Sequence, residues 1–188
     1  MTIVRAIYRT SNFDNPGLKS IIMDFTDVIK SRRSIRRYQE KAIPQKDLDE
    51  VLLCAHLAPT AINIQPWLIG CVTDRALLQK LGEIADHGHF IKDAAACFTV
   101  FCEKGQKYYL EDGSAATMNI IYACSARGIG TCWVAGDKKA YVDDVRQLLN
   151  VPEKYTLVAL VPAGYPAEQP KPSKKPIEDV AFRDRYKA

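Results

Sequence analysis

The sequence lacks several features that would assign it to a class at once. Its longest nearly apolar run, Ala94 to Cys102, has nine residues, whereas a membrane-spanning helix needs about 20. The amino-terminal residues have neither a continuous apolar core nor a small-residue cleavage site, so no secretory signal is predicted. No internal repeat or low-complexity tract is present. With apolar residues at 47% and charged residues at 26%, the composition is that of a globular protein. Because no secretory signal is predicted, we expect a protein of the reducing cytoplasm with no membrane association.

Metal-binding and redox motifs are also missing. The six cysteines include no C-x-x-C pair, which argues against a zinc ribbon and a thioredoxin-like site. Most of them stand in apolar stretches, where a free thiol behaves as a small buried hydrophobe, although an even number leaves disulfides open. The few histidines have no metal-binding spacing with carboxylates, so we expect no metal site; they are His56, His87 and His89.

Charge of one sign is not in large excess, but it is unevenly placed. The formal net charge of +4 comes from two short basic clusters, one at residues 30–41 and one at residues 171–175. The remainder of the chain is acidic. This placement favours a site for one anion over a broadly basic surface that attracts polyanions.

Hydrophobic periodicity predicts an α+β domain at residues 23–188, preceded by an extension at residues 1–22. Pro44 and Pro59 bracket one helix, and Gly128 ends the longest one. The run at Ala95–Cys102 is typical of a strand buried on both faces. The expected helices are a short one after Asp24, then 45–58, 75–84, Glu111–Arg127, 138–149 and a short polar one near the carboxyl end; the expected strands are Trp67–Thr73, Ala95–Cys102 and Thr156–Val161.

Four segments carry residues suited to binding a ligand. The first, R-R-S-I-R at residues 32–36, offers guanidinium groups that match phosphate oxygens, although a solvated basic turn or a nucleic-acid patch is an alternative. The second, P-T-A-I-N-I-Q-P-W at residues 59–67, places Asn63 and Gln65 where they can read the edge of a heterocycle. A plain polar connection with Trp67 as an anchor in the core is equally open.

The other two segments are weaker alone. Residues 128–133, G-I-G-T-C-W, follow a helix and lack the spacing of a dinucleotide fingerprint, but their glycines permit close approach to a flat ligand. Residues 164–168, G-Y-P-A-E, precede a basic, proline-rich end that alone is only a basic tail.

In this order and spacing, the four segments resemble the FMN-dependent nitroreductase family. The resemblance covers about residues 23–186 and rests on the set of motifs. It implies a mixed, largely antiparallel sheet layered with helices, and a homodimer with FMN at the subunit interface. It also implies a ping-pong reaction in which NAD(P)H reduces the flavin at N5 and a nitroaromatic, quinone or similar acceptor then takes the electrons.

The resemblance also implies roles for individual residues. The first segment would bind the FMN phosphate, ribityl chain and pyrimidine edge. The 59–65 loop would reach the flavin from the partner subunit. The 131–136 stretch would lie against the isoalloxazine, with a backbone N–H of Ala135 or Gly136 near N5. The implied FMN-binding residues are Arg32, Arg33, Ser34, Arg36, Pro59, Thr60, Ala61, Asn63, Gln65, Thr131, Trp133, Val134, Ala135, Gly136, Lys174 and Lys175.

Two departures and two weaker assignments complete the prediction. Thr60 stands where the family often has serine, and Lys174 stands where arginine is frequent, which keeps the charge but loses the bidentate fork. Tyr108 and Tyr109 could form a wall of the substrate pocket or simply pack. No catalytic side chain is expected, because the flavin carries the chemistry.

Two alternative functions remain open. One is the same fold with a different flavin reaction (reductive dehalogenation, metabolite oxidation or flavin breakdown). The other is a nucleic-acid-binding module, which the acidic character of the chain outside the two basic clusters disfavours.

Overall fold

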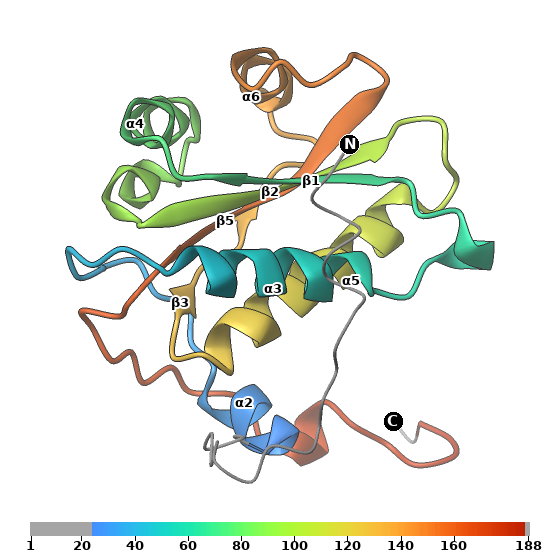
Figure 1. Ribbon diagram of the computed structural model, residues 1–188. Coiled ribbons are helices and arrows are strands. Elements are labelled where there is room, and N and C mark those ends of the chain that lie inside the picture. The colour runs from blue at the N-terminus through green and yellow to red at the C-terminus, as the bar shows by residue number, and fades with distance from the viewer. Residues whose placement is uncertain (1–23, 187–188) are drawn as a thin grey trace, which may run out of the picture.

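A computed structural model describes residues 24–186 (Figure 1). The expected extension at residues 1–22 lies outside the described residues. The helices are α2 (Phe25–Ser31), α3 (Gln45–His56), α4 (Arg75–Ile84), α5 (Tyr109–Ser125) and α6 (Val142–Leu148), with short 3-10 turns at Ala61–Asn63, His89–Asp93 and Ile177–Asp179. The strands are β1 (Trp67–Val72), β2 (Ala96–Glu103), β3 (Gly130–Thr131), β4 (Val134–Ala135) and β5 (Tyr155–Gly164).

The strands form one antiparallel sheet in which β2 and β5 are central. Its order is β1-β2-β5-β3, and β4 pairs with β5 beside β3. The β2–β5 register shifts between Val100 and Phe101, which marks an irregularity in the central pair. Seven of the eight residues of β2 are buried, so the prediction of a strand covered on both faces is confirmed.

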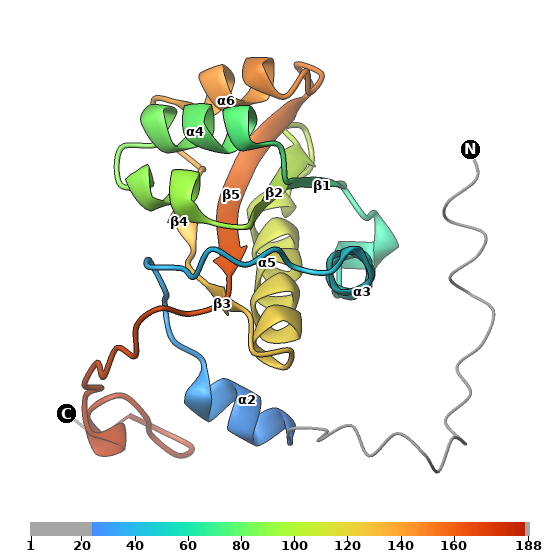
Figure 2. The same ribbon diagram turned by 60° about the vertical axis from the view of Figure 1, so that its left-hand side comes forward.

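Helices cover both faces of the sheet, as Figure 2 shows. On one face α3 and α5 pack against inward-pointing residues such as Phe98, Val100 and Val161. On the other face α4 and α6 pack against Phe101, Leu157 and others. The alternation of β2 side chains between these two cores is the period-2 pattern of a strand. The predicted α+β layering is therefore confirmed.

Capping residues set several of the helix ends. The Asp24 side chain accepts a hydrogen bond from the Thr26 amide at α2, and Asp74 accepts one from Leu77 at α4. After α5, Gly128 takes a φ of +70°, and the Ile129 amide donates to the Cys124 carbonyl. This is the turn-back that a glycine permits at a helix end, and it confirms the predicted stop.

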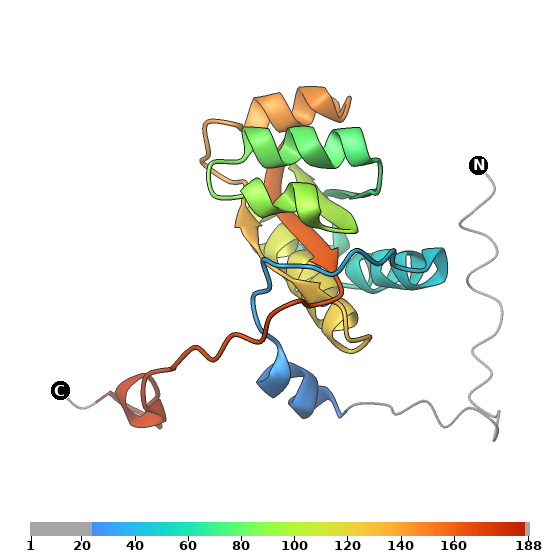
Figure 3. The same ribbon diagram turned by 90° about the vertical axis from the view of Figure 1, so that its left-hand side faces the viewer.

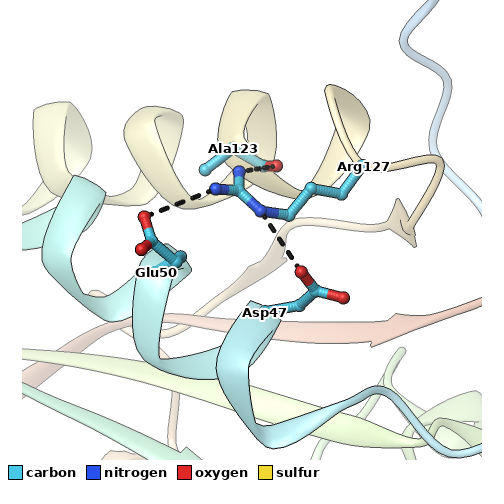
Figure 4. Close-up of polar contacts among 4 residues, drawn as sticks. All are labelled: Asp47, Glu50, Ala123 and Arg127. Carbon is cyan, nitrogen blue, oxygen red and sulfur yellow. Dashed lines mark hydrogen bonds and ion pairs between the residues drawn. The ribbon is translucent and has the colours of Figure 1, made fainter. Parts of the chain in front are cut away.

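Arg127 joins the end of α5 to α3 (Figure 4). Its guanidinium lies 3.7 Å from carboxylate oxygens of both Asp47 and Glu50, and its Nη1 donates to the Ala123 carbonyl at 2.9 Å. Because these groups are partly exposed, the ion pairs orient the helices more than they stabilise the fold.

The structure differs from the sequence-based prediction mainly at element ends. Helix α5 begins at Tyr109 and ends at Ser125, and α6 covers only Val142–Leu148 of the expected 138–149. Strands β3 and β4 were not predicted, because two-residue strands carry no periodic signal. The expected polar helix near the carboxyl end is a 3-10 turn. A further 3-10 turn that was not predicted covers residues His89–Asp93.

The segment after β5 leaves the layered body, as Figure 3 shows. Residues 171–186 are exposed. All six cysteines are free. Within residues 24–186, no helix combines the length and apolar character needed to cross a membrane.

Candidate functional site

A cavity of about 450 Å³ lies where α2, the end of α5 and the chain after β5 meet. We call it the basic cavity. It brings together three segments that are far apart in the sequence, and two arginines line it. Its lining residues are Ser31, Arg32, Arg33, Ile35, Ser125, Gly128, Ile129, Gly130, Thr131, Pro166, Glu168, Gln169 and Pro170.

Backbone hydrogen bonds hold these segments together. The Ile35 amide donates to the Thr131 carbonyl at 2.8 Å. Glu168 Oε1 accepts from the amides of Arg36 and Arg37, at 2.6 and 3.1 Å. Glu168 therefore ties the chain after β5 to the arginine-rich segment. Glu168 was predicted only as part of the G-Y-P-A-E motif; its position directly before a basic tail was the available signal.

The predicted cationic residues divide into those at the basic cavity and those elsewhere. Arg32 and Arg33 are half-buried in its wall. Arg33 Nη1 also donates to the carbonyls of Lys30 and Arg32, at 2.7 and 2.8 Å, so it closes the end of α2. The Arg36 guanidinium instead lies 5.9 Å from the centre of the Phe90 ring.

Lys174 and Lys175 do not line the basic cavity. Both are exposed in the segment after β5. The structure therefore brings two of the predicted phosphate ligands together, and it leaves the two lysines apart from them within one chain.

The predicted 131–136 stretch runs along β3 and β4 at the edge of β5. Thr131 and Val134 are buried, and Trp133 and Ala135 are exposed. A Cβ on Gly136 would lie 2.6 Å from Leu157 Cγ and 2.8 Å from its carbonyl oxygen. Glycine is therefore required there for the stretch to lie close against β5.

Two tyrosine side chains fix the carboxyl-terminal end of this stretch. The Tyr141 hydroxyl donates to the Ala135 carbonyl. The Tyr109 hydroxyl donates to Asp137 Oδ1 at 2.7 Å, and this hydrogen bond, with some burial, raises the Tyr109 pKa. Burial also raises the pKa of the Cys132 thiol, which Arg36 partly opposes. A thiol with a raised pKa is a poor nucleophile at neutral pH.

The predicted loop, residues 59–65, lies at the other end of α5. Thr60 Oγ1 donates to Asp112 Oδ2 at 2.8 Å, and the Ala61 amide donates to Asp112 Oδ1 at 3.0 Å. Gln65 Nε2 donates to Asn63 Oδ1 at 3.1 Å. The loop is therefore linked to α5 and also within itself, and Ile62 at its tip is 92% exposed.

Asp112 was missed by the sequence analysis. An acidic residue in the first turn of a helix is ordinary, since it interacts favourably with the helix dipole. The available signal was its spacing: Asp112, Ala116 and Ile120 recur every four residues along the buried face of α5. A carboxylate on that face needs hydrogen-bond donors, and the 60–61 backbone and side chain supply them.

The loop and the basic cavity are far apart within one chain. The loop is bonded at Asp112, whereas the cavity begins at Ser125, thirteen residues further along the same helix. At 1.5 Å per residue, these positions are about 20 Å apart along the α5 axis. Tyr109 lies beside the loop end of this axis and Tyr108 is exposed there, so neither lines the basic cavity.

The comparison with known proteins identifies the class. An antiparallel sheet with helices on both faces places the chain in the α+β class (Figure 2). Relatives named NAD(P)H nitroreductase and FMN reductase make it an oxidoreductase. The model of the nitroreductase family matches residues 29–108 and 88–165, so the chain belongs to the nitroreductase family.

Relatives found by sequence and by structure support this family assignment. A Methanothermobacter thermautotrophicus protein, provisionally named NADH dehydrogenase/NAD(P)H nitroreductase, is 35% identical over 153 residues, covering 79% of this chain and 80% of its own. An iodotyrosine deiodinase of Thermotoga neapolitana is 27% identical and spans 84% of this chain and 95% of its own. The solved structure of an FMN-dependent nitroreductase from Clostridium difficile superposes with a TM-score of 0.77 at 28% identity, covering 84% of this chain and 98% of its own.

Proposed function

We propose that this protein is a homodimeric, cytoplasmic FMN-dependent oxidoreductase. It would carry reducing equivalents from NAD(P)H to nitroaromatic, quinone or similar acceptors by a ping-pong reaction in one shared pocket. The observation that carries the proposal is the basic cavity, in which Arg32 and Arg33 stand beside Ser31 and the turn at Gly128–Thr131. The name of the Clostridium difficile neighbour supports FMN as the cofactor.

The donors at the cavity suit a flavin mononucleotide. Guanidinium groups stay charged at any cellular pH and bind phosphate oxygens with two parallel hydrogen bonds. Arg32 and Arg33 would hold the phosphate end, with Ser34 beside them. Lys174 and Lys175, which are exposed on the segment after β5, would complete the phosphate site as that segment closes in an assembled dimer.

A dimer is supported by the apolar surface near α2. Phe25, Ile29 and Leu57 are between 44% and 62% exposed. A second hollow of about 390 Å³ lies beside them and is lined by Tyr122, among others. Exposed apolar surface of this kind is typical of an interface between subunits.

The small residues of α5 do not support a dimer. Ala116 and Ala123 are buried in the chain's own core, so they pack within one subunit. The separation between the loop and the basic cavity is the stronger argument. Two copies can bring the loop of one to the cavity of the other.

The side chains would bind and orient, and none needs to act as an acid or base. When bound, FMN supplies the chemistry by accepting hydride from NAD(P)H and delivering electrons to the acceptor. The 131–136 stretch would support the flavin ring through backbone groups, and the absence of a side chain at Gly136 lets this stretch lie close against β5. Cations at the pyrimidine edge would stabilise negative charge that develops there.

The test is a flavin assay. Protein purified with added FMN is expected to show a visible flavin spectrum at one flavin per chain, to lose that colour with NADH or NADPH under anaerobic conditions, and to regain it with a nitroaromatic or quinone. Sedimentation would report the dimer. A colourless protein that does not retain added FMN would overturn the proposal.

A second candidate keeps the fold and FMN but changes the reaction. The Thermotoga neapolitana relative named iodotyrosine deiodinase favours reductive dehalogenation. Halide release from a halogenated phenol by the dithionite-reduced, FMN-loaded protein, which supplies two electrons while a proton replaces the halogen, would identify this reaction if NAD(P)H drives no turnover of nitro compounds or quinones. Rapid NAD(P)H-driven reduction of those acceptors without halide release would exclude it.

A further inference from the structure

The loop that links α3 to β1 has an unusual backbone. Three of its residues that are not glycine take positive φ angles: Ile62 at 44°, Asn63 at 60° and Gln65 at 54°. Positive φ is uncommon for side-chain-bearing residues, and for a β-branched residue such as isoleucine it is an outlier. Strain of this kind persists only where the surrounding structure over-determines it, and it concentrates at functional sites.

A chain of hydrogen bonds that begins at Asp112 holds the loop in this strained conformation. The carboxylate accepts from both Thr60 Oγ1 and the Ala61 amide. Thr60 Oγ1 in turn accepts from the Gln65 amide at 3.1 Å. Gln65 then donates to Asn63 Oδ1. Asn63 and Gln65 therefore take part in the chain of hydrogen bonds that starts at the Asp112 carboxylate. Ile62 lies between Ala61 and Asn63, which are both held by it.

Asp112 has the properties of a fixed anchor. It is only 6% exposed, although it lies in the first turn of α5, and its neighbour Glu111 is exposed. A general interaction with the helix dipole would serve either acid and does not require burial. A buried carboxylate that receives two donors from one loop is a strong, directional contact, because bonds to an ionised acceptor are stronger than neutral ones.

We propose that Asp112 is a positioning residue for the flavin site. It holds the 60–65 loop in the strained shape that presents Thr60, Ala61 and Asn63 to the flavin of the partner subunit. Asp112 itself touches no flavin. This inference rests on the proposed function for the identity of the ligand, but the shape of the loop is a property of the chain alone.

The first experiment needs no flavin and measures amide hydrogen exchange in the apoprotein. Thr60→Val removes the hydroxyl that joins Asp112 to Gln65 and keeps the side-chain shape. We expect the amides of Ala61 and Gln65 to exchange about tenfold faster, the loss expected for one charge-assisted hydrogen bond. Thr60→Ser, which retains the hydroxyl, should restore most of the protection.

The matched control is Thr117→Val. Thr117 Oγ1 is buried on the same helix and donates to the Gly113 carbonyl at 2.7 Å, not to the 60–65 loop. It should lower thermal stability while leaving exchange at residues 61 and 65 unchanged. Equal exchange in wild type and Thr60→Val, or the same increase in Thr117→Val, would overturn the proposal.

The second experiment uses the FMN-loaded protein and separates position from charge. Asp112→Ala removes both acceptor oxygens, whereas Asp112→Asn removes the charge but keeps an acceptor for Ala61 and a polar partner for Thr60. We expect the limiting rate of flavin reduction at saturating NADH to fall at least tenfold in Asp112→Ala, with an altered visible circular dichroism of the flavin, because small misplacements cost this much. Asp112→Asn should stay nearer to wild type.

An effect of Asp112→Asn as large as that of Asp112→Ala would assign the role to charge and overturn the positioning proposal, as would an unchanged Asp112→Ala enzyme. If Asp112→Ala does not fold, the Thr60→Val exchange result decides. Failure of the wild type to bind FMN would refute the proposed function and leave the exchange prediction standing, so the two failures are distinguishable.

Discussion

The two ends of α5 are built on different principles. At its first turn, the 60–65 loop is uncharged, strained and cross-linked through Asp112, so its shape is stored within one chain. At its last turn, the basic cavity is cationic, open to solvent and assembled from three segments distant in sequence. The first turn of α5 therefore carries a loop of fixed backbone shape, and the last turn carries a site of positive charge.

This difference indicates how a dimeric site can divide its tasks. A loop that reaches into another subunit needs a backbone conformation that is fixed before the subunits meet, because its exposed tip does not pack against its own core. A phosphate site can tolerate looser geometry because the charge attraction acts over several ångströms. Substitutions at one end of α5 can therefore be compared with substitutions at the other.

Arg32→Ala should weaken FMN binding most. Removing one bidentate, charge-assisted contact to phosphate corresponds to about 2 kcal/mol, or roughly a thirtyfold rise in the FMN dissociation constant. The measurement is titration of apoprotein with FMN by flavin fluorescence. Arg37→Ala is the matched control, because Arg37 is exposed and does not line the cavity. Comparable losses in both variants would show that general charge, and not the cavity, binds the cofactor.

Gly136→Ala should destabilise the fold by about 2 kcal/mol, because the added Cβ would meet the backbone of Leu157, which cannot move aside without disturbing β5. Chemical denaturation measures the loss. Gly105→Ala is the control, since no atom lies within 4 Å of a Cβ there. If Gly136→Ala is as stable as wild type, the stretch beside β5 is less closely packed than the structure indicates.

Glu168→Ala should lower stability by about 1 kcal/mol, the contribution of a partly exposed hydrogen-bond acceptor. It should also weaken FMN binding modestly, because the segment that closes the basic cavity loses its bonds to Arg36 and Arg37. Glu168→Gln keeps an acceptor oxygen and should lose less. Glu178→Ala, an exposed acid in the same segment, serves as the reference. No change in either quantity would show that the segment is held by packing.

The smallest expected effect is a pH dependence at the first turn of α5. The hydrogen bond that the Tyr109 hydroxyl donates to Asp137 raises the Tyr109 pKa, because the neutral phenol is the donor. The stability from this bond is therefore complete below the ordinary tyrosine pKa of about 10 and is lost as the pH rises through the raised value. Asp137→Asn should lower the Tyr109 pKa. The difference in tyrosinate absorbance between each protein and its Tyr109→Phe derivative measures it, and an unshifted titration would contradict the assignment.

Much of the fold was predictable from local signals. The caps at Asp24 and Asp74, the stop at Gly128 and the doubly buried strand at β2 all follow from side-chain chemistry and periodicity, and each is confirmed. The short strands β3 and β4 were not predictable, because they exist only through pairing with β5. Pairing partners distant in sequence leave no local pattern.

The candidate site divides in the same way. Arg32 and Arg33 could be recognised as anion ligands because guanidinium chemistry is intrinsic to the residue. The role of Glu168 depends on which amides lie within reach, and that of Asp112 depends on a threonine fifty-two residues away. Neither dependence is visible along the chain.

Residue chemistry and short spacings were enough to predict the stop at Gly128, the buried central strand, the two basic clusters and the family to which the chain belongs. The three-dimensional arrangement was needed to find that Lys174 and Lys175 lie apart from the arginines within one chain, and that one buried carboxylate shapes the 60–65 loop. The physical reason is that hydrogen bonds and charge interactions act through space over a few ångströms, whatever the separation of the residues along the chain.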